Sequence, residues 1–261
     1  AEREEFTTHL HRGYYFLEHY DEDLAMRMAE DLLARQRAQA GSGLLGTALH
    51  QLGRMCLNRQ QYERATLLLD EAIDYWRHRS GDLGHGTALQ WSLIDRGRAA
   101  HFLKDRAMAF LCYDESIAIF AASQYSMGSG FPLLYRGYLW MEEEDPRRAE
   151  GDFRLCIHAV DKNMWPKLVV RAVAGLAEAA YACGDLARSG RLLGAAAKFD
   201  AEAIKSDPIS SSARARFAEI YEFRRSLATA CERRHNSTFD AAWQEGSQLT
   251  LIEAIALGLE G

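Results

Sequence analysis

Four stretches of this chain repeat one order of small and large residues, and that internal repeat constrains the fold more than any other feature of the sequence. Successive copies are offset by 44, 40 and 40 residues. In each copy, a small residue precedes a second small residue, which is followed by a large one and then by a third small one. These residues are Gly53, Ala65, Leu69 and Ala72; Gly97, Ala109, Tyr113 and Ser116; Gly137, Ala149, Phe153 and Cys156; and Ala177, Ser189, Leu193 and Ala196.

The spacing of the pattern has a packing cause. Small residues let two antiparallel helices approach closely, and the large residue fills the gap to the neighbouring pair. Only four prolines occur in 261 residues, and the stretches between them are rich in Ala, Leu, Glu and Arg. Such composition favours helices over strands. The sequence therefore predicts an all-α fold built from stacked helical pairs.

Over residues 45 to 200 the pattern resembles the tetratricopeptide consensus. The usual first-helix Trp and trailing Pro are mostly absent, and the period exceeds the usual ~34 residues, so we expect longer helices or longer connections. The resemblance implies an α-solenoid, a right-handed superhelix of helix-turn-helix repeats. The array is expected at 1–205, with a degenerate unit at 1–42 and repeats at about 43–82, 86–125, 128–163 and 167–204.

The segment 206–261 is expected to form C-terminal capping helices of the same domain. Pro208 interrupts the last repeat helix, because proline cannot continue a helix. Helical spacing resumes at 211–235, 239–245 and 251–259. Thr250, with Glu253 three residues later, predicts an N-terminal capping box for the last of these helices.

Charge and cysteine content narrow the class of protein. A net charge of −6 gives no general field that attracts nucleic acid or an anionic membrane. Arg233 and Arg234 belong to the densest basic stretch, which we interpret as a solvated helix face. Five cysteines without a C-x-x-C pair favour a reducing, cytoplasmic setting, and no apolar run is long enough to span a membrane. Cys56 and Cys156 occupy packing positions, which predicts buried, inert thiols.

The tail of the chain carries a second resemblance. Phe239-Asp240-Ala241-Ala242-Trp243-Gln244-Glu245-Gly246, then Leu249-Thr250-Leu251 and Glu253-Ala254-Ile255-Ala256, follow Gly184-Asp185 and the run from Arg191 to Ala196. This order resembles the C-terminal end of bacterial STAND regulators, the LuxR-type ATPase-coupled transcription factors. In that family the phrase F-x-x-A-W-x-E-G, followed by L-x-L-x-E-A-I/V, closes a tetratricopeptide-like array.

The STAND resemblance implies a sensor domain that controls an upstream nucleotide-binding switch in the same polypeptide. The first residue is Ala1 rather than Met, which we expect of a fragment excised from a longer protein. The sequence contains no G-x-x-x-x-G-K-[S/T] phosphate loop and no recognisable helix-turn-helix reader. Direct contact with nucleic acid is therefore not expected from this chain.

Sequence patterns for catalysis and metal binding are weak. His9, His11 and His19 lack the spacing and the cysteine partners of a metal site. No nucleophile stands beside a base in a recognisable pattern, although a triad is defined by geometry rather than by sequence order. We therefore expect a protein that is not an enzyme and that needs no metal and no cofactor.

Binding in a concave groove is the favoured function, because the first helix of each stacked pair lines the inner side of such an array. The tetratricopeptide resemblance points one set of side chains inward. This candidate site consists of His50, Arg54, Trp91, Arg98, His101, Phe131, Tyr138, Arg171, Glu178 and Tyr181. Trp91 and Phe131 fit core packing as well as exposure. Arg54 and Arg98 are the stronger candidates, because they recur at one repeat position and a buried, unpaired arginine is costly.

Aromatic and cationic side chains together suit a peptide, a protein or a small carboxylate-bearing effector. The leading hypothesis is a signal-sensing domain of a bacterial transcriptional regulator, in which effector binding changes the curvature of the array or its contacts with the upstream ATPase domain. The alternative is a constitutive protein-protein interaction scaffold or oligomerisation module. The sequence leaves the oligomeric state open, and a homodimer is one option.

Overall fold

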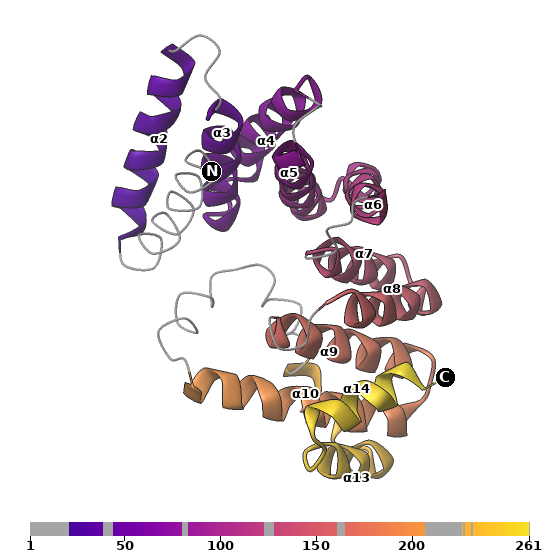
Figure 1. Cartoon of the computed structure of the whole chain (residues 1–261). Coiled ribbons are helices and arrows are strands. Elements are labelled where there is room, and N and C mark those ends of the chain that lie inside the picture. Colours follow the sequence, from indigo (N-terminus) through magenta and orange to yellow (C-terminus); the bar gives the residue numbers. More distant parts are fainter. Residues whose placement is uncertain are drawn as a thin grey trace. The chain divides into compact units, whose positions relative to one another are not determined.

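The described part of the chain is almost entirely helical (Figure 1). The computed structural model describes residues 21–38, 44–79, 83–122, 128–160, 165–206, 226, 228–230 and 232–260, and among these it contains no strand. This confirms the all-α prediction. In chain order the helices are α2 (Glu22–Ala38), α3 (Leu45–Asn58), α4 (Tyr62–Arg77), α5 (Leu83–Phe102), α6 (Arg106–Ala122), α7 (Gly130–Glu142), α8 (Pro146–Ala159), α9 (Pro166–Ala182), α10 (Leu186–Ser206), α13 (Ser237–Gly246) and α14 (Leu251–Leu259).

One tight turn recurs between the two helices of each of the four repeats, α3–α4, α5–α6, α7–α8 and α9–α10. It contains a residue with left-handed backbone geometry, followed by the residue that opens the second helix. The left-handed residues are Gln60, Lys104, Glu144 and Gly184, with φ of 61°, 63°, 58° and 84°. They follow the same offsets as the sequence repeat. In three copies the next residue, Asp105, Asp145 or Asp185, accepts a hydrogen bond from a backbone N–H in the first turn of the second helix.

The glycines of the repeat lie where the paired helices cross, as the sequence predicted. A Cβ atom at any of them would stand closer to the facing ring or leucine than real Cβ atoms do. The predicted cause of the pattern, close approach of the paired helices, is therefore confirmed for these copies. The closest distances are 2.8 Å from Gly53 to Leu69, 2.5 Å from Gly97 to Tyr113 and 2.5 Å from Gly137 to Phe153.

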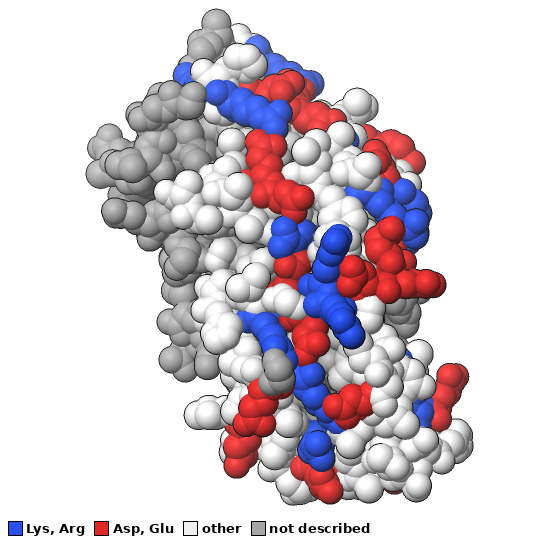
Figure 2. All heavy atoms as spheres, turned by 90° about the vertical axis from the view of Figure 1, so that its right-hand side faces the viewer, with Lys and Arg blue, Asp and Glu red and all other residues white. Residues whose placement is uncertain are grey.

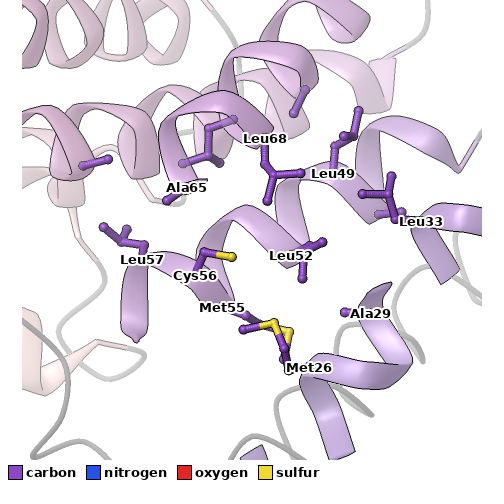
Figure 3. Close-up of a cluster of buried hydrophobic side chains, with 14 of the residues drawn as sticks. Met26, Ala29, Leu33, Leu49, Leu52, Met55, Cys56, Leu57, Ala65 and Leu68 are labelled. Atoms are coloured by element: carbon purple, nitrogen blue, oxygen red, sulfur yellow. The ribbon is translucent and has the colours of Figure 1, made fainter. Parts of the chain in front are cut away.

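The chain divides into two units, Ala1–Ile119 and Phe120–Gly261. In the first, here unit 1, α2 packs against α3, α3 against α4, and α5 against both α3 and α4. Figure 3 shows part of the apolar core where α2, α3 and α4 meet. Its buried side chains include Met26, Ala29, Leu33, Leu49, Leu52, Met55, Cys56, Leu57, Ala65 and Leu68.

In the second unit, here unit 2, α7, α8, α9 and α10 pack in sequence, and α13 lies against α10 (Figure 1). The backbones of α10 and α13 touch. A Cβ atom at Gly190 would lie 2.6 Å from the carbonyl oxygen of Phe239, and one at Gly246 would lie 2.0 Å from that of Arg191. The glycine that ends the Phe239 to Gly246 phrase is thus required for this crossing. Helix α14 packs against α8, α9 and α10.

The ends of several helices agree with the sequence analysis. Pro146 and Pro166 stand in the first turns of α8 and α9, where the missing proline N–H has no helical partner to lose. The predicted capping box at α14 is confirmed: Glu253 N–H donates to the Thr250 hydroxyl, and the Glu253 carboxylate accepts from the Thr250 N–H. Residues 1–20 of the first expected unit, and most of the helix expected at 211–235, lie outside the described residues.

The surface carries mixed charge. Within unit 1, ion pairs join neighbouring helices, as between Arg64 and Glu30 at 2.6 Å and between Arg77 and Glu115 at 2.7 Å. On the face drawn in Figure 2, acidic and basic side chains alternate instead of separating by sign. Exposed pairs of this kind contribute about 1 kcal/mol or less each. Among the described helices, none combines the length and the apolar character needed to cross a bilayer.

Candidate functional site

In unit 1, three of the candidate residues gather around a carboxylate that the sequence did not single out. His50 Nε2 on α3 lies 3.0 Å from Asp95 Oδ2 on α5, and Arg98 Nη1 donates to Asp95 Oδ1 at 2.8 Å. The side chains of His50, Asp95 and Arg98 are at most 8% exposed. Arg54 adds a further positive charge that acts on Asp95. The inner positions of two successive first helices thus converge on one acidic group.

The charge state of Asp95 follows from these contacts. Burial alone raises the pKa of a carboxyl, but the hydrogen bond from His50 and the charges of Arg98 and Arg54 outweigh it and lower the pKa of Asp95 to about 2. Asp95 is therefore a carboxylate at neutral pH. Arg98 was expected in a groove because a buried arginine without a partner is costly; it is buried, and Asp95 is its partner.

Arg54 and Gln51 complete what we call the polar cluster, which consists of His50, Gln51, Arg54, Asp95 and Arg98. Arg54 is partly buried, and its Nη2 donates to Gln51 Oε1 at 3.0 Å. Gln51 is almost fully buried, and its Nε2 lies away from water with no hydrogen-bond acceptor. Among these five side chains, two guanidinium groups accompany one carboxylate.

Two further candidates lie elsewhere in unit 1. His101 is partly buried and stacks on Phe102, which in turn stacks on Tyr62 with ring centroids 4.9 Å apart. Burial raises the pKa of the Tyr62 hydroxyl, and the charge of Arg98 acts against this rise. The aromatic stack thus lies near enough to the polar cluster for Tyr62 to sense the charge of Arg98. Trp91 is partly buried on α5.

In unit 2 the aromatic candidates are engaged in packing. Phe131 meets Trp165 edge-on with ring centroids 5.2 Å apart, and both rings are partly buried. Tyr138 is buried, packs against Phe153, and donates its hydroxyl to the backbone carbonyl of Arg171 at 3.1 Å. The Tyr138 hydroxyl thus links α7 to α9, and the group of Arg171 that it contacts is the main-chain carbonyl.

Glu178 and Tyr181, on the last turns of α9, share a partner from the C-terminal segment. Arg233 donates from both of its terminal nitrogens to the Glu178 carboxylate at 2.8 Å, and its guanidinium lies 3.8 Å from the centre of the Tyr181 ring. The solvated face predicted for Arg233 is thus wrong, since its side chain is 13% exposed. Arg234 is more exposed and pairs with Asp240.

The thiols at packing positions are buried, as predicted. Burial raises the pKa of the Cys56 thiol, and it raises that of the Cys156 thiol far above the usual range. Both therefore stay protonated and unreactive at neutral pH. Cys183 is exposed. Over the described part of the chain, His, Cys, Asp and Glu side chains form no group of three that could hold a metal ion.

Three residues of these sites were not among the predicted site residues: Asp95, Gln51 and Arg233. Asp95 and Gln51 each stand one position beyond an inward-facing residue, so the consensus geometry passed over them. Glu178 and Arg233 are separated by 55 residues, and no local pattern links them. A search of protein-family models and of curated proteins finds no match to this chain.

Proposed function

We propose that this chain is the effector-binding repeat domain of a bacterial STAND-type transcriptional regulator, and that it binds rather than catalyses. The effector is a peptide or small molecule with a carboxylate group. The proposal is supported by the resemblance of the Phe239 to Gly246 phrase and its flanks to that family. The helical pairs that pack in series are of the kind such sensor domains use.

The observation that carries the proposal is the polar cluster of unit 1. Such inner positions can be filled by apolar side chains, as Leu57 and Ile94 show on the same helices. Instead, the cluster concentrates polar groups in an environment of low exposure, where an added carboxylate gains more from guanidinium groups than it does in water. The Nε2 group of Gln51 is a further donor without an acceptor.

The mechanism requires a difference between two states. An effector controls the upstream nucleotide-binding switch only if it binds one arrangement of the domain more tightly than the other. Because the polar cluster links α3 to α5, an anion that takes up Arg54 changes the balance of charge around Asp95. Such a change alters the packing of one first helix on the next, which is the contact that sets the curvature of a repeat array.

Calorimetric titration of the whole chain with mono-, di- and tricarboxylates and an Asp/Glu-rich peptide tests the site. Arg54 is the residue to change, because it is only partly buried and its replacement leaves the His50–Asp95–Arg98 contacts in place. We expect Arg54→Ala to weaken binding by about tenfold or more, the loss of one charge-assisted contact. Arg77→Ala, the control, removes the same charge from an outer ion pair with Glu115. Equal affinity of wild type and Arg54→Ala contradicts the proposal.

A second candidate is the constitutive scaffold, and one observation favours it. Leu67 on α4 and Leu111 on α6 are 72% and 59% exposed, and they are separated by the same 44 residues as the repeat. Exposed leucines at equivalent positions suit contact with another protein or a second copy. Light scattering that shows a concentration-dependent oligomer, lost in a Leu67→Glu variant, together with a chain that binds no carboxylate, favours the scaffold.

A further inference from the structure

The contact between Arg233 and α9 has the chemistry of an arginine-recognition site. Its two parts are a carboxylate that accepts two parallel hydrogen bonds and an aromatic face that supports the guanidinium plane. Glu178 and Tyr181, three residues apart on α9, provide these two parts. Arginine is the side chain that uses both at once, because its rigid fork matches a carboxylate and its flat, weakly hydrated charge stacks on a ring.

Glu178 and Tyr181 remain accessible in different degrees. The Glu178 side chain is 18% exposed beneath Arg233, whereas Tyr181 is 37% exposed. The ring of Tyr181 also meets Phe239, the first residue of the C-terminal phrase, edge-on with centroids 6.4 Å apart. The aromatic floor of the site is therefore held by α13, while its outer edge faces solvent.

Both residues belong to the positions that the repeat consensus directs inward, whereas Arg233 comes from outside the repeats. Its contacts with Glu178 and Tyr181 both lie on a single helix, α9. We propose that Glu178 and Tyr181 form a binding site for an arginine side chain of a partner peptide, and that Arg233 occupies this site in cis until the partner displaces it. This site lies wholly within unit 2 and is independent of the carboxylate site proposed for unit 1.

The exchange keeps the same interactions, because one arginine replaces another on the same carboxylate and ring. An empty site is unfavourable, since a largely buried carboxylate then loses its partner. The partner must instead overcome the effective concentration of Arg233, which exceeds the roughly millimolar value of a flexible connection because Arg233 lies in an ordered segment that leads into α13. A peptide with contacts besides its arginine achieves this, whereas a free arginine does so only weakly.

The test is a titration of the ¹⁵N-labelled whole chain with Nα-acetyl-arginine amide, followed through the backbone amide signals of Glu178 and Tyr181. We expect Arg233→Ala to bind this probe at millimolar concentration and about tenfold or more tightly than wild type. Nα-acetyl-lysine amide, which lacks the fork and the flat face, is expected to bind the same variant more weakly. Arg234→Ala, the matched control, removes the neighbouring arginine and should behave as wild type.

Two further variants keep the result decisive. The double variant Arg233→Ala/Glu178→Gln should lose the probe, because the paired carboxylate is gone. If Arg233→Ala is unfolded, judged by rapid reaction of buried Cys156 with a thiol reagent, Arg233→Lys retains the charge without the fork and should bind the arginine probe more tightly than wild type. The proposal is overturned if wild type and the folded Arg233 variant bind the arginine probe equally. It is also overturned if the variant binds the lysine probe as tightly as the arginine probe.

Discussion

The two units contain the same type of helical pair, but different interactions link the inner positions of their first helices. In unit 1, α3 and α5 are joined by buried charge: His50 and Arg98 both contact the carboxylate of Asp95. In unit 2, α7 and α9 are joined by a neutral hydrogen bond from Tyr138 to a main-chain carbonyl. Glu178, a charged inner residue of α9, instead pairs with Arg233 from beyond the repeats.

The two units distinguish two features of the repeat, namely the residues where helices cross and the residues at the inner positions. The positions where helices cross are the same in both units, because Gly97 and Gly137 accommodate a ring in the same way. The inner positions are less uniform, because the position that holds Arg54 and Arg98 in unit 1 holds Tyr138 and Glu178 in unit 2. The same arrangement of helical pairs therefore carries a polar cluster in unit 1 and, in unit 2, a site that Arg233 of the same chain occupies.

The largest effect that separates the units is expected from Asp95→Asn. The variant leaves His50 and Arg98 buried without their carboxylate, which costs about 3–5 kcal/mol. Thiol labelling in increasing denaturant measures this, because buried Cys112 reports on unit 1 and buried Cys156 on unit 2. Cys112 should react at lower denaturant, with Cys156 unchanged. A shift of Cys156 of equal size contradicts a cluster that stabilises unit 1 alone.

The acid dependence of unit 1 should come next in size. Asp95 has a folded pKa of about 2, below the ordinary 3.8, so its stabilising contribution is complete above pH 4 and is lost as the pH falls towards 2. The contribution is on the order of 2 kcal/mol. The difference in denaturation midpoint between wild type and Asp95→Asn, followed by Cys112 labelling after a return to neutral pH, should narrow over this range. A difference that stays constant from pH 5 to pH 2 argues against this assignment.

Alanine at the crossing glycines should affect the two units alike. Gly97→Ala and Gly137→Ala place a methyl group within 2.5 Å of Tyr113 or Phe153, and forcing a group into a packed core costs about 1–3 kcal/mol. The control is Gly151→Ala on α8, where a Cβ meets nothing within 4 Å and the gain in helix propensity should stabilise by up to about 1 kcal/mol. Denaturation midpoints compare the three variants, and stabilisation by all three would disprove the close approach.

The smallest effect is expected at the turns. Lys104 and Glu144 adopt left-handed geometry that only Gly184 adopts without strain. Lys104→Gly and Glu144→Gly should therefore stabilise unit 1 and unit 2, respectively, by up to about 1 kcal/mol, measured by the same labelling of Cys112 and Cys156. The gain is reduced by the greater freedom of glycine in the unfolded chain. Clear destabilisation by both changes means that the side chains of Lys104 and Glu144 outweigh the backbone strain.

The sequence predicted features that depend on local spacing. The crossing residues, the buried thiols and the Thr250 capping box follow from positions close together along the chain, and the structure has them. The turn geometry at Gln60 and its equivalents gave a readable signal only at Gly184, because the other three residues adopt it against their preference.

The polar contacts were not predictable in the same way. Whether Asp95 reaches His50, 45 residues earlier, depends on the rotation of two helices about their axes, which small shifts in packing decide. Arg233 was assigned to a solvated helix face because it stands in the densest basic stretch, where Glu219, Glu222 and Glu232 could balance its charge. Its actual partner, Glu178, becomes available only through the packing of the C-terminal segment on α9.

Hydrogen exchange with and without a carboxylate that binds tests the central claim, that the two units differ in what their inner positions bind. Peptides from α3 and α5 report on the polar cluster, and peptides from α9 and α13 report on the site held by Arg233. We predict that a bound carboxylate slows exchange in α3 and α5 and leaves α9 and α13 unchanged. Protection confined to α9 and α13 would contradict the account.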